Sequence, residues 1–406
     1  MGVSITQTCA NMVKTCVGAG ILALPNTFYG AGLVPSLIIL IVVTLWSGFC
    51  TKRLVSCMTS TLEGVLGNIF DDNNDPYFHL VRKALGKFGV VLLNICYVVT
   101  LYGIATAYQI TWTNLLIHMD WEKIGFSLGS ERWFWCIIYF IIVLPLSYLR
   151  NLDSLGFVSL FGNIVIGVSS ILVLVYGGIH WGFHWDNSLL WYKNPMDMAV
   201  IFGVFCYALC IIFIGPTSKK TLNNGNKFDF CLWISLLICF ALYSVLGGFG
   251  AIFFKEDPNG IDAIVLDNMT DSPIFYYITA IGLCMSCLAS YPIAVYPAAL
   301  AVESWITDTL DKPENKTFVR NWKRIVMRTC MLAVVTILAF VFPDFKKVIG
   351  LIGCLTVSTV QFILPPLVHY RLSPSNTWST ILDISLTVIG VLVMVFTTYC
   401  TIVTSN

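Results

Sequence analysis

Charged side chains are scarce in this chain of 406 residues. Asp, Glu, Lys and Arg make up 11% of it, against about 25% in an ordinary soluble domain, and 57% of the residues are hydrophobic. Mean hydropathy is +0.81. This composition excludes a sizeable soluble domain and indicates a protein embedded in a lipid bilayer. The net charge of +1 gives no basic surface, so we expect no nucleic-acid partner.

The chain also lacks patterns that bind metals or carry out catalysis. Its 15 cysteines form no Cys-x-x-Cys pair with histidine partners, and its five histidines are scattered over loops and segment ends. We therefore expect no catalytic residues, no metal ion, no cofactor and no structural disulfide. A channel is disfavoured too, because the sequence has neither a ring of charges nor a repeat that resembles a selectivity filter.

Long hydrophobic runs dominate what is present. Eleven of them are long enough to cross roughly 30 Å of hydrocarbon as helices, which predicts one all-α polytopic membrane domain over residues 1–406. The expected membrane segments, numbered 1 to 11 in chain order, are residues 7–30, 32–57, 88–117, 132–149, 153–179, 196–217, 228–254, 273–303, 324–342, 346–370 and 377–403.

The distribution of basic residues predicts the orientation of these segments. Lys and Arg gather in the loops of one side, which the positive-inside rule makes the cytosolic side. The N-terminus is then cytosolic and the C-terminus lumenal or extracellular, as an odd number of segments requires. Asn268 begins an Asn-x-Thr pattern in a loop on the non-cytosolic side, which predicts a glycosylation site.

Glycine interrupts the first segment. Residues 10–25 read ANMVKTCVGAGILALP, so Gly18 and Gly20 lie at membrane depth, where they weaken a helix. Backbone groups freed there must be satisfied by protein, water or ligand, and many secondary transporters bind their substrate at such breaks. Lys14 precedes the break by one turn, and an ionisable residue within a membrane segment indicates a functional site.

The sixth segment begins five segments after the first and carries Gly203 ahead of a polar and aromatic centre. A repeat unit of five segments inverts in the membrane, and inverted repeats are common among secondary transporters. We therefore expect one repeat over residues 7–179, a second over residues 196–370, and one extra helix over residues 377–403.

Residues 11–25 resemble the first segment of the amino acid/auxin permease family. Three further stretches are similar to that family: residues 203–216 to its second broken helix, residues 290–297 (SYPIAVYP) to its eighth segment, and residues 352–370 to its tenth. The resemblance covers nearly the whole chain and includes the eleven segments. It implies a secondary amino-acid transporter of the APC superfamily that works by alternating access, with the inverted-repeat fold of the bacterial leucine transporter.

The resemblance also bears on the coupling ion and the membrane. Sodium-coupled members usually have Asn four residues before the first glycine of the break, whereas this chain has Lys14 there, as proton-coupled, vacuolar and lysosomal members do. It therefore implies protons, or facilitated exchange, rather than sodium. It favours a vacuolar or lysosomal membrane, with the plasma membrane as the alternative, and a monomer. Tyr207 and Ala208 stand where some proton-coupled members carry an acidic residue, which leaves substrate type and coupling open.

The residues around the two breaks form the expected substrate site. Amides at a helix start bind a carboxylate, carbonyls at the end of the preceding half-helix bind an ammonium group, and neighbouring side chains select the substrate side chain. The expected residues are Thr15, Cys16, Gly18, Ala19, Gly20, Ile21, Tyr102, Phe205, Cys206, Tyr207 and Ser286.

Lys14 has two functional interpretations and one structural interpretation. It replaces a sodium ion as a charge between the first and eighth segments, near Ser286 and Ser290, or it is a permanent counter-charge for a carboxylate. Alternatively it extends to the membrane interface. Two other functions stay open: a nutrient sensor that binds amino acids without net transport, and a sodium-coupled neutral amino-acid transporter.

Overall fold

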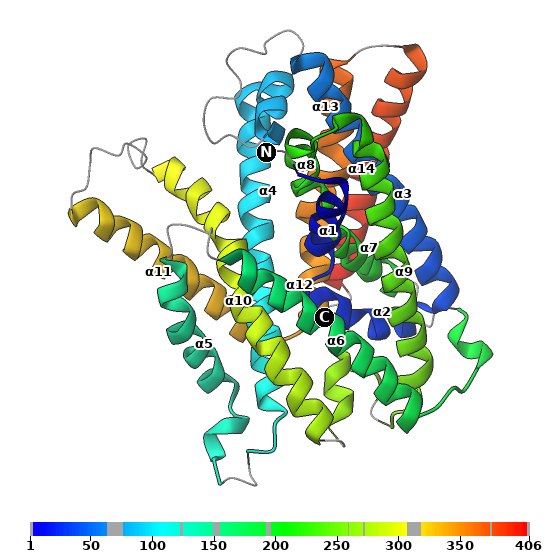
Figure 1. Cartoon of the computed structure of the whole chain (residues 1–406), viewed down its shortest axis with the longest axis vertical. Helices are drawn as coiled ribbons and strands as arrows, with labels where there is room; N and C mark the ends of the chain where they lie inside the picture. The colour runs from blue at the N-terminus through cyan, green and yellow to red at the C-terminus, as the bar shows by residue number, and fades with distance from the viewer. Residues whose placement is uncertain are drawn as a thin grey trace.

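The computed structural model describes residues 3–62, 76–121, 125–148, 155–191, 196–258, 260–270, 273–306, 318–373 and 376–403, which form a bundle of helices (Figure 1). Each of the eleven expected segments coincides with a helix or an interrupted pair of helices. They are α1 (Ile5–Cys16) with α2 (Leu24–Ala31), α3 (Leu33–Leu62), α4 (Pro76–Ile117), α5 (Arg132–Ser147), α6 (Leu155–His180), α7 (Asp197–Ala208) with α8 (Gly215–Thr221), α9 (Phe228–Phe254), α10 (Pro273–Ile306), α11 (Phe318–Val341), α12 (Phe345–Ile352) with α13 (Leu364–Leu372), and α14 (Thr377–Val403).

The helices have the length and the surface of membrane segments. Within the described residues, eight candidate spans are long and apolar enough to cross a membrane, nine with the bent pair α1–α2, and Arg132–Ser147 and Ile164–His180 are shorter apolar helices. Large apolar side chains such as Ile38, Ile337 and Leu392 are exposed on the outside of the bundle. Apolar surface of this extent suits lipid rather than water, and the prediction of an all-α polytopic membrane protein is confirmed.

The two interrupted segments at the centre run in opposite directions. The start of α1 lies beside the end of α8, because the amide of Val3 donates to the Thr221 carbonyl at 2.8 Å. The end of α2 lies beside the start of α7, because a Cβ atom added to Gly30 would be 3.7 Å from Asp197 Oδ2. We call the first of these ends the N-terminal face and the second the C-terminal face (top and bottom in Figure 1).

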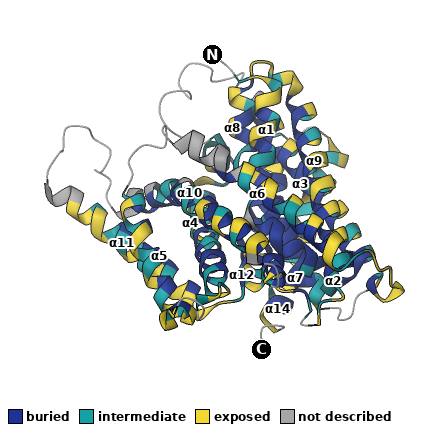
Figure 2. Ribbon diagram, turned by 60° about the horizontal axis from the view of Figure 1, so that its bottom comes forward, coloured by how far each residue is buried: buried dark blue, intermediate teal, exposed yellow. Residues whose placement is uncertain are grey.

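The sixth and tenth segments form the most buried part of the bundle (Figure 2). In each, 78% of the most apolar stretch is buried, against 22% in α11 and in α14. Their backbones touch: a Cβ atom on Gly353 would lie only 1.8 Å from the Gly203 carbonyl oxygen. Small residues permit such close helix contacts in membranes. Gly203, which the sequence placed near the second break, therefore serves this contact inside α7.

Two π-helical stretches, Gly353–Val357 and Thr359–Ile363, join α12 to α13. π turns are rare and occur mostly at functional sites. Here they lie directly against the centre of the bundle, because Gly353 and Phe362 contact Gly203 and Phe202 of α7. The tenth segment therefore reaches the second break with a backbone that is wider than an α-helix.

Candidate functional site

The first break lies where the sequence predicts it. Helix α1 ends at Cys16, Gly18 is extended with φ −120° and ψ −168°, and a 3₁₀ turn over Ala19–Ala23 leads into α2. The two helix axes differ in direction by 53°. Glycine is costly inside a helix, whereas Pro25 suits the first turn of α2 because its missing N–H is not needed there.

The second break separates α7 from α8. Helix α7 ends at Ala208, a 3₁₀ turn covers Ile211–Phe213, and α8 starts at Gly215 with proline in its first turn. The Leu209 amide donates to the Phe205 carbonyl at 2.9 Å. No backbone amide among the described residues donates to the carbonyls of Cys206 and Tyr207, so these two carbonyls are open to another donor.

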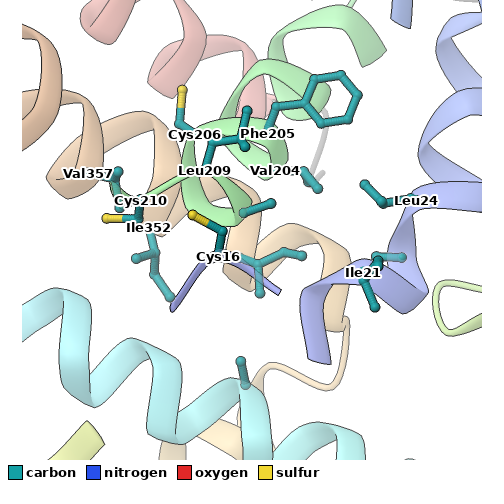
Figure 3. Close-up of a cluster of buried hydrophobic side chains, with 14 of the residues drawn as sticks. Cys16, Ile21, Leu24, Val204, Phe205, Cys206, Leu209, Cys210, Ile352 and Val357 are labelled. Carbon is teal, nitrogen blue, oxygen red and sulfur yellow. The ribbon is translucent and has the colours of Figure 1, made fainter. Parts of the chain in front are cut away.

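Tyr243 of α9 joins the two breaks. Its hydroxyl lies 2.7 Å from the Cys16 carbonyl oxygen and 2.9 Å from the Ala208 carbonyl oxygen, and its side chain is completely buried. The last carbonyls of α1 and α7 thus converge, from opposite directions, on one hydroxyl hydrogen. Figure 3 shows Cys16 on the side of Leu209 and Cys210, with the Cys206 thiol pointing away from it.

The ring of Tyr207 packs against the first break at Gly20. A Cβ atom on Gly20 would lie 3.1 Å from its Cε1 atom, whereas a Cβ atom on Gly18 would meet nothing within 4 Å. The ring therefore leaves little room for a side chain at position 20, whereas there is space beside position 18. Of the expected site residues, the structure brings Cys16, Gly18, Gly20, Cys206 and Tyr207 together.

Other expected residues point elsewhere. The Tyr102 hydroxyl contacts Met331 Sδ of α11 at 2.7 Å, and Ser286 donates to the Gly162 carbonyl of α6 at 3.1 Å. Phe205 is buried edge-to-face against Phe28 of α2, with 5.9 Å between ring centroids. Thr15 is exposed, and its hydroxyl donates to the Asn11 carbonyl within α1. These side chains support helices in this conformation and do not line the breaks.

Lys14 is half-buried on α1 and makes no hydrogen bond or ion pair within the described ranges. Helix α1 packs mainly against α9, with α8 near its start. Ser290 of α10 instead lies beside the hydroxyl of Tyr108, which belongs to α4. The structure thus shows no contact between Lys14 and either expected serine of the eighth segment.

Sequence reasoning missed three polar residues at the centre. Tyr243 bridges the breaks, and Gln361 donates through Nε2 to the Leu209 carbonyl at 3.1 Å and to the Ser47 hydroxyl. Tyr108 lies near Tyr207 and Cys287. Each is a polar group within a hydrophobic run, which is the feature that singled out Lys14.

The loop that contains Asn268 is folded against the C-terminal face. Asn268 is 5% exposed, and Nδ2 donates to Asp257 Oδ2 at 2.9 Å and to the Gly260 carbonyl at 2.7 Å. Both amide hydrogens are therefore used. Glycosylation of this residue stays a prediction, and attachment of a sugar would have to precede the folding of the loop.

A family profile described as transmembrane amino acid transporter protein matches residues 1–403. The chain belongs to this family. It is 23% identical to the Arabidopsis thaliana protein named amino acid transporter AVT1J, over 98% of this chain and 90% of that protein. Vacuolar amino acid transporter 4 of Saccharomyces cerevisiae is 22% identical, over 96% of this chain and 56% of that protein. A Xenopus tropicalis protein named putative sodium-coupled neutral amino acid transporter 8 is 24% identical, over 88% and 82%.

Among solved structures, the inward facing conformation of Mhp1 is similar with a TM-score of 0.61 at 10% identity, covering 99% of this chain and 91% of that one. The likeness confirms the expected fold. Membership of the family confirms the resemblance drawn from residues 11–25 and makes the chain an amino-acid transporter rather than an enzyme. The relatives include proteins named as vacuolar and one named as sodium-coupled, so the coupling ion does not follow from them.

Proposed function

We propose that this chain moves amino acids by alternating access around the two paired breaks. The observation that carries the proposal is the antiparallel meeting of α1 and α7, whose last carbonyls converge on Tyr243. Half-helix ends offer carbonyls to a cation, and half-helix starts offer amides to an anion. An amino-acid zwitterion carries both charged groups on one carbon atom, so it uses both kinds of backbone group at once.

The internal hydrogen bonds narrow the groups available to the substrate. The Gly18 amide donates to the Cys16 carbonyl at 3.0 Å, and the Ile21 amide donates to the Gly18 carbonyl at 3.1 Å. In our proposal the next amides of the break, those of Ala19 and Gly20, bind the substrate carboxylate. The lack of a side chain at Gly20 lets the Tyr207 ring pack against this backbone.

The ammonium group has a separate place in the proposal. The open carbonyls of Cys206 and Tyr207 at the end of α7 accept its hydrogens, since the Phe205 carbonyl is already bonded to Leu209. The Tyr207 ring, which lies against Gly20, forms one wall for the substrate side chain. This arrangement modifies the expected site, because it places the ammonium one residue beyond Phe205.

We further propose that protons, not sodium, are the coupling ion. In transporters with broken helices, half-helix carbonyls coordinate sodium. Here the carbonyls of Cys16 and Ala208 accept the Tyr243 hydroxyl instead, which supports a site without sodium. In this proposal Lys14, one turn before the break, is the positive charge that replaces the sodium ion. The proposal also includes two inverted repeats, over residues 7–179 and 196–370. It places the N-terminus in the cytosol and the chain in a vacuolar or lysosomal membrane as a monomer.

The test is a panel of labelled amino acids offered to the purified chain in proteoliposomes, with sodium and proton gradients imposed separately. We expect saturable uptake that a proton gradient drives and that sodium leaves unchanged. Strict sodium dependence would reject the coupling and favour the second candidate, a sodium-coupled carrier, which the Xenopus relative's name supports. Saturable binding with no flux would identify an amino-acid sensor instead.

The role of Lys14 is tested with the variant Lys14→Ala and the matched control Lys52→Ala. Lys52 is exposed and pairs with Asp229 at 2.6 Å, and such surface pairs contribute little. We expect Lys14→Ala to lose the response to the proton gradient while Lys52→Ala keeps it. An unchanged response in Lys14→Ala would remove this lysine from coupling and leave the interface interpretation.

A further inference from the structure

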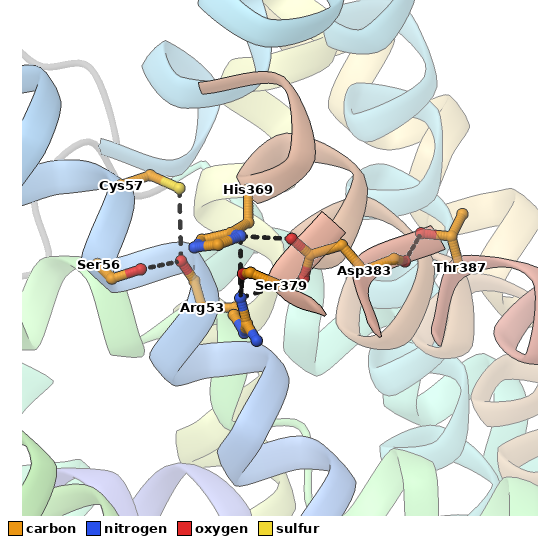
Figure 4. A network of polar contacts seen from close by, with 7 residues as sticks. All are labelled: Arg53, Ser56, Cys57, His369, Ser379, Asp383 and Thr387. Atoms are coloured by element: carbon orange, nitrogen blue, oxygen red, sulfur yellow. Dashed lines mark hydrogen bonds and ion pairs between the residues drawn. The ribbon is translucent and has the colours of Figure 1, made fainter. Parts of the chain in front are cut away.

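A buried ionic cluster lies away from the breaks, near the N-terminal face, where α3, α13 and α14 meet (Figure 4). Asp383 of α14 is 1% exposed, and its Oδ2 atom lies 2.5 Å from His369 Nδ1 of α13. Its Oδ1 atom lies 3.5 Å from Nη1 of Arg53 on α3, which also donates to the Ser379 hydroxyl. Charge thus ties α3 to the consecutive helices α13 and α14, which lie more than 300 residues away in the sequence.

The charges of the cluster depend on one proton. The guanidinium of Arg53 is always positive and balances the Asp383 carboxylate when the imidazole is neutral. In that state Nδ1–H of His369 donates to Asp383, so the 3.2 Å between Nδ1 and Arg53 Nη1 is an approach of two donors. A second proton on the imidazole would put a new positive charge beside the guanidinium. Histidine is the side chain that normally changes charge between about pH 5 and 8.

The other groups around the cluster are neutral or turned away. From α3, the buried thiols of Cys50 and Cys57 lie near Asp383. From α4, Tyr77 donates its hydroxyl to the Val360 carbonyl at 2.6 Å, whereas Arg82 and Lys83 are exposed. The charge balance around His369 is therefore set by Arg53 and Asp383.

The tenth segment connects this cluster to the second break. Gln361, eight residues before His369 and so about 12 Å away along a helix, donates to the Leu209 carbonyl in the break. The same amide donates to Ser47 of α3, the helix that also carries Arg53. Segments 2 and 10 are therefore joined at two levels, one at the break and one in the ionic cluster. The π-helical stretch Thr359–Ile363 contains Gln361 and therefore the contact at the break.

We propose that His369 is a proton-binding site, and that its protonation changes how firmly α13 and α14 hold α3 and thereby the position of the α7 break. A proton from the N-terminal side adds to the free imidazole nitrogen, and no bond other than N–H forms or breaks. The imidazolium repels Arg53, which weakens the tie to α3, and Gln361 transmits the change to the Leu209 carbonyl. This inference rests on the proposed transport, whose rate would respond to pH on that side.

The experiment compares wild type, His369→Gln and His79→Gln in proteoliposomes, with pH varied between 5 and 8 on the side of the N-terminal face. Glutamine keeps an N–H donor for Asp383 but does not titrate in this range, and His79 is a half-exposed histidine of the same face. We expect the pH profile of initial uptake in His79→Gln to match that of wild type and the profile in His369→Gln to differ from it. Arg53→Gln, which removes the guanidinium beside the imidazole, should alter this pH profile as well.

A second measurement keeps the inference separate from transport. The melting temperature of each variant in lipid nanodiscs is followed over the same pH range, and the difference between wild type and His369→Gln should vary with pH. If wild type shows no flux but its melting temperature still differs from that of His369→Gln in a pH-dependent way, the proposed function is rejected and the proton site is retained. Equal pH profiles of wild type and His369→Gln, in flux and in melting, would overturn the inference. If Arg53→Gln does not fold, His369→Gln alone decides.

Discussion

Lys346 of α12 donates a hydrogen bond to Asn26 of α2, with 2.7 Å between Nζ and Oδ1. Asn26 in turn donates through Nδ2 to the Ile261 carbonyl, which belongs to the loop between α9 and α10. Asp197 at the start of α7 lies close by, since a Cβ atom on Gly30 would be 3.6 Å from Lys346 Nζ and 3.7 Å from Asp197 Oδ2. At the C-terminal face, these contacts link the second half of segment 1 to the starts of segments 6 and 10.

Replacing this lysine should loosen the C-terminal face. A hydrogen bond to a charged group contributes about 1.5–3 kcal/mol, and each ~1.4 kcal/mol is a tenfold change in an equilibrium. We expect Lys346→Met to reduce concentrative uptake in proteoliposomes at least about tenfold, because the closed form of this face becomes less stable. The matched control is Lys347→Met, since Lys347 is exposed and pairs with nearby Asp344 at 3.4 Å. Equal effects of the two variants would contradict a closing role for Lys346.

The hydroxyl of Tyr243 should matter more than an ordinary buried hydroxyl. Tyr243→Phe removes the shared donor of the Cys16 and Ala208 carbonyls. The Cys16 carbonyl keeps the Gly18 amide, whereas the Ala208 carbonyl loses its donor, and an unsatisfied buried acceptor costs about 1–3 kcal/mol. We expect substrate affinity, measured by equilibrium binding, to fall roughly tenfold. Tyr276→Phe is the control, because it removes one equally buried hydrogen bond, to the Leu115 carbonyl at 2.8 Å, away from the breaks. A normal affinity in Tyr243→Phe would separate this hydroxyl from the substrate site.

Much of this architecture could be predicted because its causes are local. The eleven hydrophobic runs and the glycines at positions 18 and 20 act within a few residues, so the segments and the first break appear directly in the sequence. The direction in which each helix turns a given side chain depends on its neighbours. Tyr102 and Tyr108 are six residues apart on α4. At about 100° per residue, their side chains point in directions that differ by about 120° around the helix. The first contacts α11, and the second faces α10 near the breaks.

The central hydrogen bonds could not be predicted for a related reason. Tyr243 and Gln361 bind backbone carbonyls, and every residue of every segment has a carbonyl. Only the folded arrangement selects which carbonyls lose their helical partner and face these side chains. The ionic cluster joins Arg53 to His369 and Asp383, which lie more than 300 positions away, so this contact is invisible before the helices are packed.

The two glycines of the first break should respond differently to alanine. In Gly20→Ala the new methyl group would lie 3.1 Å from the Tyr207 ring, so the ring has to move, whereas in Gly18→Ala it meets no protein atom within 4 Å. We expect Gly20→Ala to raise the KM for uptake several-fold and Gly18→Ala to fold and melt like wild type. If Gly18→Ala impairs uptake as strongly as Gly20→Ala, the space beside Gly18 is occupied by substrate, and the ligand rather than Tyr207 sets the limit there.

An ion pair at the C-terminal face predicts a pH-dependent stability. His118, just beyond the end of α4, lies 3.0 Å from Asp267 through Nδ1. The hydrogen bond to Asp267 raises the pKa of His118, and partial burial opposes this effect. A raised folded-state pKa means that the stabilisation is complete below the unfolded value of about 6.5 and is lost as pH rises through the folded-state pKa.

The melting temperature should therefore decrease by a small step as pH rises above about 6.5, and the step should be absent in His118→Gln. The step is small because the His118 side chain is 47% exposed and the pair is screened by water and salt. His180→Gln is the control: His180 stacks on Tyr176 and should leave the step unchanged. Added salt should shrink the step in wild type, because the His118 side of the pair is open to solvent. A step that persists in His118→Gln would assign the titration to another group.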